Sequence, residues 1–455
     1  MSKSSIPKGT RDFGPSAMAR RNYIFDTIRA SFERYGFLPI ETPAMENLAT
    51  LTGKYGEEGD QLIFKILNNG DFLTKADAEA LAAKDSKKLG FSISKKALRY
   101  DLTVPFARFV VMHQNNIAFP FRRYQIQPVW RGDRPGKGRY QEFFQCDADI
   151  IGTNALVCEV ELVQLFDEVL SNLRIPDFSI KINNRKILAG LAEVAGVGEL
   201  LTDMTVALDK LDKIGADKVM DEMRGRGISE DSIAKLQPLL ELGTDTEANL
   251  EALAGLLAGN ETGEKGIEEL RYVLAEAERL GLRDAKLEFD PTLARGLNYY
   301  TGAIFEVKAN GVGIGSICGG GRYDDLTGIF GLKGMSGVGI SFGADRIYDV
   351  LEELDLFPAG ATRSTELLYI NFGSAEQGKC LEWLTAARKA GIRAEVYPSS
   401  AKLKKQMQYA NDKSIPWVVL AGSQEIEQGV VTLKHMESGE QETMSPEAVF
   451  AKLRP

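Results

Sequence analysis

Arginine and aromatic side chains that could bind a nucleotide are concentrated in residues 121–152, FRRYQIQPVWRGDRPGKGRYQEFFQCDADIIG. Two apolar runs flank a polar, glycine-containing loop from Gly132 to Arg139, which predicts two β-strands joined by a long basic loop. Arginine forks bind phosphate oxygens in pairs, and aromatic rings stack on bases. The segment is therefore a candidate nucleotide-binding hairpin. P-loop and Rossmann sites are not supported, because neither GxxxxGK[ST] nor a GxGxxG after a strand occurs.

Three further segments embed charged or aromatic residues among glycines: 289–307, 317–326 and 335–351. Glycine weakens a strand but is tolerated where a ligand approaches the backbone closely. Arg346 falls in the first turn of a predicted helix, where the helix polarity favours anions. Asp149 stands among apolar strand residues, and an unpaired buried carboxylate is costly, so it should have a partner or a ligand.

Length, charge and residue usage bound the class of protein. The chain of 455 residues is long enough for two to four domains, and no apolar run of about 18 residues predicts a membrane span. The amino terminus lacks an apolar signal core, so we expect a cytoplasmic protein. Two histidines and four scattered cysteines predict no metal site made by protein side chains. The net charge of −9 argues against nonspecific coating of nucleic acid.

Several elements must position these residues. The sequence predicts a helix over 16–34 and a strand that closes at Pro43, a helix near 75–88, and a helix that begins near Thr103, its candidate cap. Leucine, alanine and glutamate dominate from about 186 to 280, which indicates a helical insert, and strand and helix patterns alternate after residue 365.

Together these segments resemble the histidyl-tRNA synthetase family of class II aminoacyl-tRNA synthetases over nearly the whole length. PKGTRDFGP is similar to the family's amino terminus, and the helix and strand before Pro43 to motif 1, a dimer-interface element. The 121–152 hairpin resembles motif 2, and GVGISFGADRI motif 3. ARGLNYYTG and CGGGRYDDL are similar to the two histidine-specific signatures. The residues after 365 resemble the anticodon-binding domain of that group.

The resemblance implies an α+β fold with the class II antiparallel six-stranded sheet and flanking helices, a helical insertion and a C-terminal α/β anticodon-binding domain. The expected boundaries are 1–185 with 281–357 for the catalytic core, 186–280 for the insertion and 365–455 for the anticodon-binding domain. It also implies a homodimer that uses ATP with Mg²⁺ to join L-histidine to tRNA(His).

The resemblance assigns roles residue by residue. Catalytic charge neutralisation would come from Arg131, Arg295 and Arg346, and ATP binding from Arg131, Arg139, Phe143 and Arg346. Asp149 and Tyr300 match the imidazole partners. The ammonium acceptors match Asp101, Thr103 and Gln145, and the histidine-binding set is completed by Arg295, Tyr299 and Tyr323. Asn298 departs from the family's usual aspartate, so no role that needs a carboxylate is assigned to this position.

One alternative comes from a different class: a non-catalytic paralogue that acts as the regulatory subunit of ATP phosphoribosyltransferase, or as a sensor of uncharged tRNA. Such paralogues typically lack the anticodon-binding domain and lose catalytic arginines, whereas Arg131, Arg295 and Arg346 all stand here. A synthetase for another amino acid is disfavoured by ARGLNYYTG and GGGRYDDL.

Overall fold

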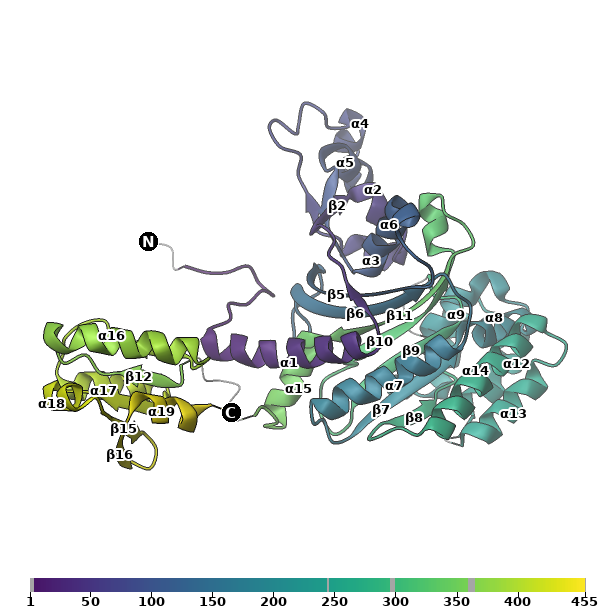
Figure 1. Ribbon diagram of the computed structural model, residues 1–455. Coiled ribbons are helices and arrows are strands. Elements are labelled where there is room, and N and C mark those ends of the chain that lie inside the picture. Colours follow the sequence, from purple (N-terminus) through teal and green to yellow (C-terminus); the bar gives the residue numbers. More distant parts are fainter. Residues whose placement is uncertain (1–3, 244, 295–298, 359–364, 455) are drawn as a thin grey trace. The chain divides into compact units, whose positions relative to one another are not determined.

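The computed structural model describes residues 4–243, 245–294, 299–358 and 365–454, and leaves out the side chains of residues 57, 58, 212 and 213 (Figure 1). The chain forms two compact units, one of Met1–Asp12 with Ile24–Leu356, the other of Phe13–Tyr23 with Phe357–Pro455. The three predicted domain boundaries remain predictions.

The first unit is built on an eight-stranded sheet with the order β1-β5-β6-β11-β10-β9-β7-β8. The six central strands are antiparallel throughout, as the resemblance implies. One short strand extends each edge by parallel pairing. The strands are β1 (Leu38–Pro39), β5 (Phe121–Trp130), β6 (Glu142–Ile151), β7 (Phe178–Asn184), β8 (Lys286–Phe289), β9 (Ala303–Ala309), β10 (Cys318–Asp324) and β11 (Ser336–Gly343).

Strand alternation gives this sheet two unlike faces, because successive side chains point to opposite sides. The apolar face is covered by residues 24–34 of α1 (Pro15–Arg34), by α7 (Val157–Asn172) and by α15 (Ala344–Glu353). Phe342 of β11 packs there, its ring 5.8 Å from Phe32 of α1 and 5.4 Å from Phe166 of α7. The opposite face is polar.

The register fixes which residues share the polar face. Asp147 of β6 lies opposite Gln125 of β5 and Ser341 of β11, and Asp149 lies opposite Arg123 and Gly339. The alternation that buries the phenylalanines therefore also aligns the acidic residues of β6 in one row.

A small three-stranded sheet with the order β2-β4-β3 is formed by residues that lie in sequence between β1 and β5. The helix expected near 75–88 is wrong as a single element: α4 and α5 replace it, each capped by an aspartate, Asp77 and Asp85. Thr103 is not a cap but the first residue of α6, and Asp101 accepts from the Val104 N–H instead. The elements are β2 (Met45–Asn47), α2 (Leu48–Leu51), α3 (Gly56–Gln61), β3 (Lys65–Ile66), α4 (Ala78–Ala82), α5 (Ser86–Ile93), β4 (Lys96–Leu98), α6 (Thr103–His113) and η1 (Gln114–Asn116).

Helices occupy residues 185–280 of the described chain almost continuously, as the composition predicts. They are α8 (Arg185–Val194), η2 (Gly198–Leu200), α9 (Leu201–Leu208), α10 (Leu211–Ile214), α11 (Ala216–Gly225), α12 (Glu230–Leu240), α13 (Thr246–Leu256) and α14 (Glu261–Leu280). A short helix, η3 (Leu326–Phe330), follows β10.

The second unit contains a five-stranded sheet with the order β13-β12-β14-β15-β16. Two buried apolar clusters pack against this sheet. One cluster includes Leu367 and the other includes Leu368, which are neighbouring residues of the same strand. The alternation expected after residue 365 is present, with one additional short helix, α18. The elements are β12 (Leu367–Tyr369), α16 (Ser374–Lys389), β13 (Ala394–Val396), α17 (Leu403–Asp412), β14 (Trp417–Leu420), α18 (Ser423–Gln428), β15 (Val431–His435), β16 (Gln441–Met444) and α19 (Pro446–Leu453).

Candidate active site

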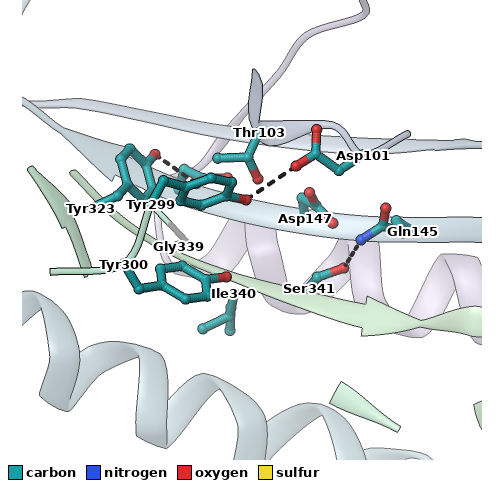
Figure 2. A pocket seen from close by; sticks show the side chains of 11 residues that line it. Asp101, Thr103, Gln145, Asp147, Tyr299, Tyr300, Tyr323, Gly339, Ile340 and Ser341 are labelled. Carbon is teal, nitrogen blue, oxygen red and sulfur yellow. Dashed lines mark hydrogen bonds between the residues drawn. The ribbon is translucent and has the colours of Figure 1, made fainter. Parts of the chain in front are cut away.

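A cavity of about 40 Å³ lies on the polar face of the eight-stranded sheet (Figure 2). Seven of the eight residues expected to bind histidine line it, and the eighth, Arg295, lies outside the described residues. Sequence reasoning missed four residues of the lining. The full lining is Asp101, Thr103, Gln145, Asp147, Asp149, Tyr299, Tyr300, Tyr323, Gly339, Ile340 and Ser341.

Asp149 has protein partners on both carboxylate oxygens. The Tyr323 hydroxyl donates to Oδ1 at 2.7 Å, and Arg123 Nη2 lies 2.6 Å from Oδ2. Arg123 is fully buried on β5, directly opposite Asp149 in the strand register. Burial raises the pKa of Asp149, and Arg123 opposes this rise. The partner that the sequence demanded for this buried carboxylate is therefore an arginine two residues into the preceding strand.

Asp101 is also saturated. Its Oδ1 accepts from the Tyr55 hydroxyl at 2.9 Å and from the Val104 N–H at 3.2 Å, while Oδ2 accepts from the Tyr299 hydroxyl at 3.1 Å. The last of these contacts can be followed in Figure 2. Burial raises the pKa of Asp101, and these hydrogen bonds lower it. Asp101 thus ties the first turn of α6 to the tyrosine pair of the histidine signature.

Asp147, which sequence reasoning missed, has a free oxygen. It is 2 % exposed, and its Oδ1 has no hydrogen-bond partner among the described residues. The Oε1 atom of Gln145 is likewise buried without a partner in the described part of the chain, although Gln145 Nε2 donates to Ser341 Oγ at 2.9 Å. Burial raises the pKa of Asp147 to about 7. A two-residue repeat of acceptors at 145, 147 and 149 was the available signal for Asp147.

The signature glycines make room for the pocket side chains. A Cβ atom on Gly339 would stand 1.9 Å from Asp149 Oδ1, one on Gly337 2.5 Å from the Tyr323 ring, and one on Gly321 2.9 Å from the Tyr300 ring. From sequence, glycine-spaced strands indicate close approach of a ligand. In the structure the groups that approach are side chains of the protein itself, which form the wall that a ligand would meet.

The arginine end of the site begins where β5 ends. Arg131 donates from Nε to the Tyr100 carbonyl at 3.1 Å, and its guanidinium lies 4.3 Å from the Tyr100 ring centre and 5.3 Å from that of Phe143. The backbone N–H of Arg131 donates to the Gln141 carbonyl at 3.0 Å, which holds the base of the hairpin loop. Arg131 is therefore fixed beside the pocket by both its backbone and its side chain.

Arg346 lies in the first turn of α15, as the sequence predicts. Its Nε donates to the Gly138 carbonyl at 2.8 Å and its Nη1 to the Ser316 carbonyl. Burial lowers its pKa, and the nearby charges of Arg131 and Arg139 lower it further. The structure thus brings three of the four expected phosphate-binding arginines into electrostatic range of one another. Such a like-charged group favours an anion between its members.

The amino-terminal segment supports the hairpin loop. The Gln141 N–H donates to the Gly9 carbonyl at 2.8 Å, and the Arg11 guanidinium lies 3.3 Å from the Tyr140 ring centre. Arg11 also pairs with Asp345 of α15, whose second oxygen accepts from the Phe144 N–H at 2.8 Å. The PKGTRD segment therefore links the hairpin to the helix that carries Arg346.

Metal-binding clusters and membrane-spanning helices are both lacking in the described residues. No group of three or more His, Cys, Asp or Glu side chains there could hold a metal ion. No helix in the described part of the chain is long and apolar enough to cross a membrane.

An antiparallel sheet that places a carboxylate-and-tyrosine pocket next to a row of arginines, in a chain with a separate α/β unit, is the architecture of an aminoacyl-tRNA synthetase. Comparison with known proteins gives the particular family. The sequence model described as Histidyl-tRNA synthetase matches residues 82–347, and that described as Anticodon binding domain matches residues 368–455. The chain belongs to the histidyl-tRNA synthetase family.

Relatives and solved structures agree. The chain is 62% identical over 443 residues to a histidine–tRNA ligase of Christiangramia forsetii, covering 97% of each, and 57% identical over 452 residues to one of Phocaeicola vulgatus, covering 99% of each. The crystal structure of histidyl-tRNA synthetase from Nostoc sp. PCC 7120 superposes with a TM-score of 0.83 at 30% identity, over the full length of both chains.

A Bacillus halodurans structure titled as an ATP phosphoribosyltransferase regulatory subunit/histidyl-tRNA synthetase gives a TM-score of 0.70 at 22% identity, covering 90% of this chain and 97% of its own. That likeness reports the fold alone. The ligases at more than 50% identity therefore favour an enzyme over the regulatory paralogue.

Proposed function

We propose that the chain is a histidine–tRNA ligase that activates L-histidine with ATP in this cavity and transfers it to tRNA(His). The observation that carries the proposal is the adjacency of two complementary parts, the buried acceptors of β6 and the arginines at the hairpin loop. An amino acid needs acceptors for its ammonium group and its polar side chain. An attacked phosphate needs cations, because negative charge grows on its oxygens in the transition state.

The arginine end supplies the second need. The carboxylate of histidine would attack the α-phosphate of ATP, and pyrophosphate would leave. By resemblance, Arg131 would hold the α-phosphate and Arg346 the γ-phosphate, with Arg139 on a further phosphate oxygen and Phe143 beside the base. Arg295, also by resemblance, would neutralise charge that develops during catalysis. Mg²⁺ would arrive with ATP and offset charge on its β- and γ-phosphates.

The acceptor end supplies specificity. Asp149 and Tyr300 would bind the imidazole nitrogens, with Tyr323 and Arg123 holding Asp149 in place. An aliphatic side chain would leave these buried groups without partners, which costs far more than a missing methylene in an apolar pocket. By resemblance, Asp101, Thr103 and Gln145 would form the part of the pocket around the ammonium, and Tyr299 would hold Asp101.

The same proposal extends to the assembly. We expect a cytoplasmic homodimer in which residues 365–455 read the anticodon and residues 186–280 form an insertion over the acceptor arm. Large apolar side chains are exposed on and just after the elements that resemble the family's dimer motif, with Leu38 59% and Met45 52% exposed. Sedimentation of the purified chain would test the dimer, and a monomer at micromolar concentration would contradict it.

ATP–pyrophosphate exchange, with each of the twenty amino acids tested separately, tests the central reaction. We expect exchange with histidine alone. Exchange with another amino acid would overturn the specificity, and folded protein that binds histidine without exchange would point to the regulatory or sensor class. In that outcome Asn298→Asp would be the first variant to make.

A further inference from the structure

We propose that Asp147 is a specificity-determining residue that receives the ammonium group of the substrate, with Gln145 Oε1 as the second acceptor. This deepens the proposed function and rests on it. The resemblance to the family assigned the ammonium to Asp101, Thr103 and Gln145 and gave Asp147 no role. The structure distributes the free acceptor atoms differently.

The other two carboxylates of the cavity have a protein partner beside each oxygen. Three buried carboxylates line it. Asp101 accepts from two tyrosine hydroxyls and a backbone N–H. Asp149 accepts from Tyr323 on one oxygen, and its other oxygen makes no hydrogen bond among the described residues but lies 2.6 Å from the Arg123 guanidinium in an ion pair. Only a ligand that displaced these partners, or shared their acceptor, could bind there. Asp147 Oδ1 needs no displacement, because it is buried without a hydrogen-bond partner among the described residues.

The described neighbours of Asp147 on the adjacent strands leave its Oδ1 atom without a hydrogen bond. Gln125 stands directly opposite on β5, but its Nε2 donates to Thr42 Oγ1 at 2.8 Å and to Gln127 Oε1. On the other side stands Ser341, which has only one hydroxyl proton to give and accepts from Gln145 Nε2 at 2.9 Å. The acceptor atom of Asp147 that remains free among the described residues, Oδ1, is therefore available to a ligand in the cavity.

Charge balance also favours a cationic ligand at Asp147. An unpaired buried carboxylate is destabilising, and the cation that lowers the pKa of Asp147, Arg123, is already in an ion pair with Asp149. A ligand that brings a positive charge and several N–H donors would satisfy Asp147 Oδ1 and Gln145 Oε1 together. An ammonium group provides both in a volume that a cavity of about 40 Å³ accepts.

The spacing along β6 matches the substrate. Asp147 and Asp149 lie two residues apart on one face of the strand, a step of about 6.8 Å. This step is comparable with the length of a histidine from its amine to the far ring nitrogen. Figure 2 shows Asp147 and Gln145 on the same side of the cavity, apart from the Tyr323 ring. The amine would therefore lie near 145 and 147 while the imidazole reaches 149.

A comparison of ligands that differ by one group tests the assignment. We would measure calorimetric affinities of wild type and Asp147→Asn for L-histidine and for histidinol, which keeps the amine. Competition at millimolar concentration would give the affinity for 3-(imidazol-4-yl)propionate, which lacks the amine. Asp147→Asn should weaken histidine and histidinol by about 10- to 100-fold, the range for a hydrogen bond to a charged group. The propionate should change by less than about threefold.

Equal losses for all three ligands would overturn the proposal, because Asp147 would then contact the ring or act only through structure. Unchanged affinity for histidine would also overturn it. Asp167→Asn is the matched control: Asp167 is another buried aspartate, on α7, which packs on the apolar face, and it accepts from the backbone N–H groups of residues 283–285. Its replacement should alter stability without changing the ratio of the three affinities.

Failure of the inference and failure of the proposed function are separable. Wild-type protein that neither binds histidine nor supports exchange contradicts the function. Wild-type protein that does both, while Asp147→Asn binds histidine equally well, contradicts only the role of Asp147.

Discussion

The two large sheets of this protein treat polar groups differently. The eight-stranded sheet buries arginines and carboxylates, and two acceptor atoms of its pocket have no partner among the described residues. In the described residues 365–454, the only buried side chains of the polar and charged types are Asn371 and Gln406. Both are satisfied by backbone groups: Gln406 accepts from the Asn371 backbone N–H at 2.9 Å and donates to its carbonyl at 2.8 Å. The Asn371 side chain donates to the Tyr397 carbonyl at 3.1 Å and accepts from the Gly373 N–H at 3.1 Å.

This difference indicates where each unit has polar groups free to bind a ligand. A closed hydrogen-bond network stabilises a fold and leaves no buried polar group for a ligand, so a ligand of residues 365–454 would bind at their surface. The buried acceptor atoms of the first sheet that lack partners in the described chain, Gln145 Oε1 and Asp147 Oδ1, mark an interior site. Buried charge alone is not the criterion, because the first unit also contains the closed pair of Glu159 and Arg322.

Removing that closed pair gives the largest expected loss of stability. Both side chains are buried, and Arg322 Nη2 donates to Glu159 Oε2 at 2.7 Å. Glu159→Gln leaves a buried guanidinium uncompensated and should lower the free energy of unfolding by about 3–5 kcal/mol. Denaturant unfolding measures this loss. The KM for histidine should stay within about twofold of wild type, and a parallel rise in KM would place the pair in the site.

Arg131→Ala should have the largest effect on catalysis. Loss of a fixed cation at a developing charge typically lowers kcat by about 10²- to 10³-fold. Histidine-dependent pyrophosphate exchange measures this effect. Arg134→Ala, on the same loop, is the control and should leave exchange nearly unchanged. Equal effects of both substitutions would show that the loop acts only through its summed charge.

Gly339→Ala should lower kcat/KM for histidine by about 100-fold, because the new methyl group would stand 1.9 Å from Asp149 Oδ1 and must displace it. The matched control lies in the second unit. Gly378 of α16 has no atom within 4 Å of the place that an added methyl group would occupy. Gly378→Ala should therefore stabilise its helix by about 0.5–1 kcal/mol. A tolerated Gly339→Ala would mean that Asp149 is not held where the structure puts it.

The pH dependence of stability isolates Asp147. Its pKa is raised by burial to about 7, with Arg123 lowering it and Asp149 and Asp101 raising it, while Ser341 donates to it. Since the folded state binds this proton more tightly than the unfolded state, the free energy of unfolding should fall by roughly 1 kcal/mol per pH unit from about pH 4 to 7. Asp147→Asn should remove that slope in histidine-free protein. An unchanged slope between about pH 5 and 7 would assign it to another group.

Much of this architecture was readable from the sequence. The hairpin of β5 and β6, the helix carrying Arg346 and the helices near 186–280 all follow from periodicity and turn residues. The resemblance located seven of the eleven residues that line the cavity. The roles assigned to those residues remain predictions.

The remainder depended on facts that a single sequence does not carry. Arg123 and Asp149 meet only because the strand register pairs them, and register is set by the whole sheet. The free oxygen of Asp147 can be recognised only in the structure, where the side chains beside it are seen to have other hydrogen-bond partners. Thr103 was a reasonable cap by residue type, but the tertiary contacts of Asp101 decided the start of α6.

A crystal structure of the protein with bound L-histidine would test the proposed site most directly. We predict the imidazole against Asp149 and Tyr300, the carboxylate toward Arg131, and the ammonium within hydrogen-bonding distance of Asp147 Oδ1 and Gln145 Oε1. A histidine bound in the reverse direction, or with its ammonium on Asp101 alone and a water on Asp147, would contradict this arrangement.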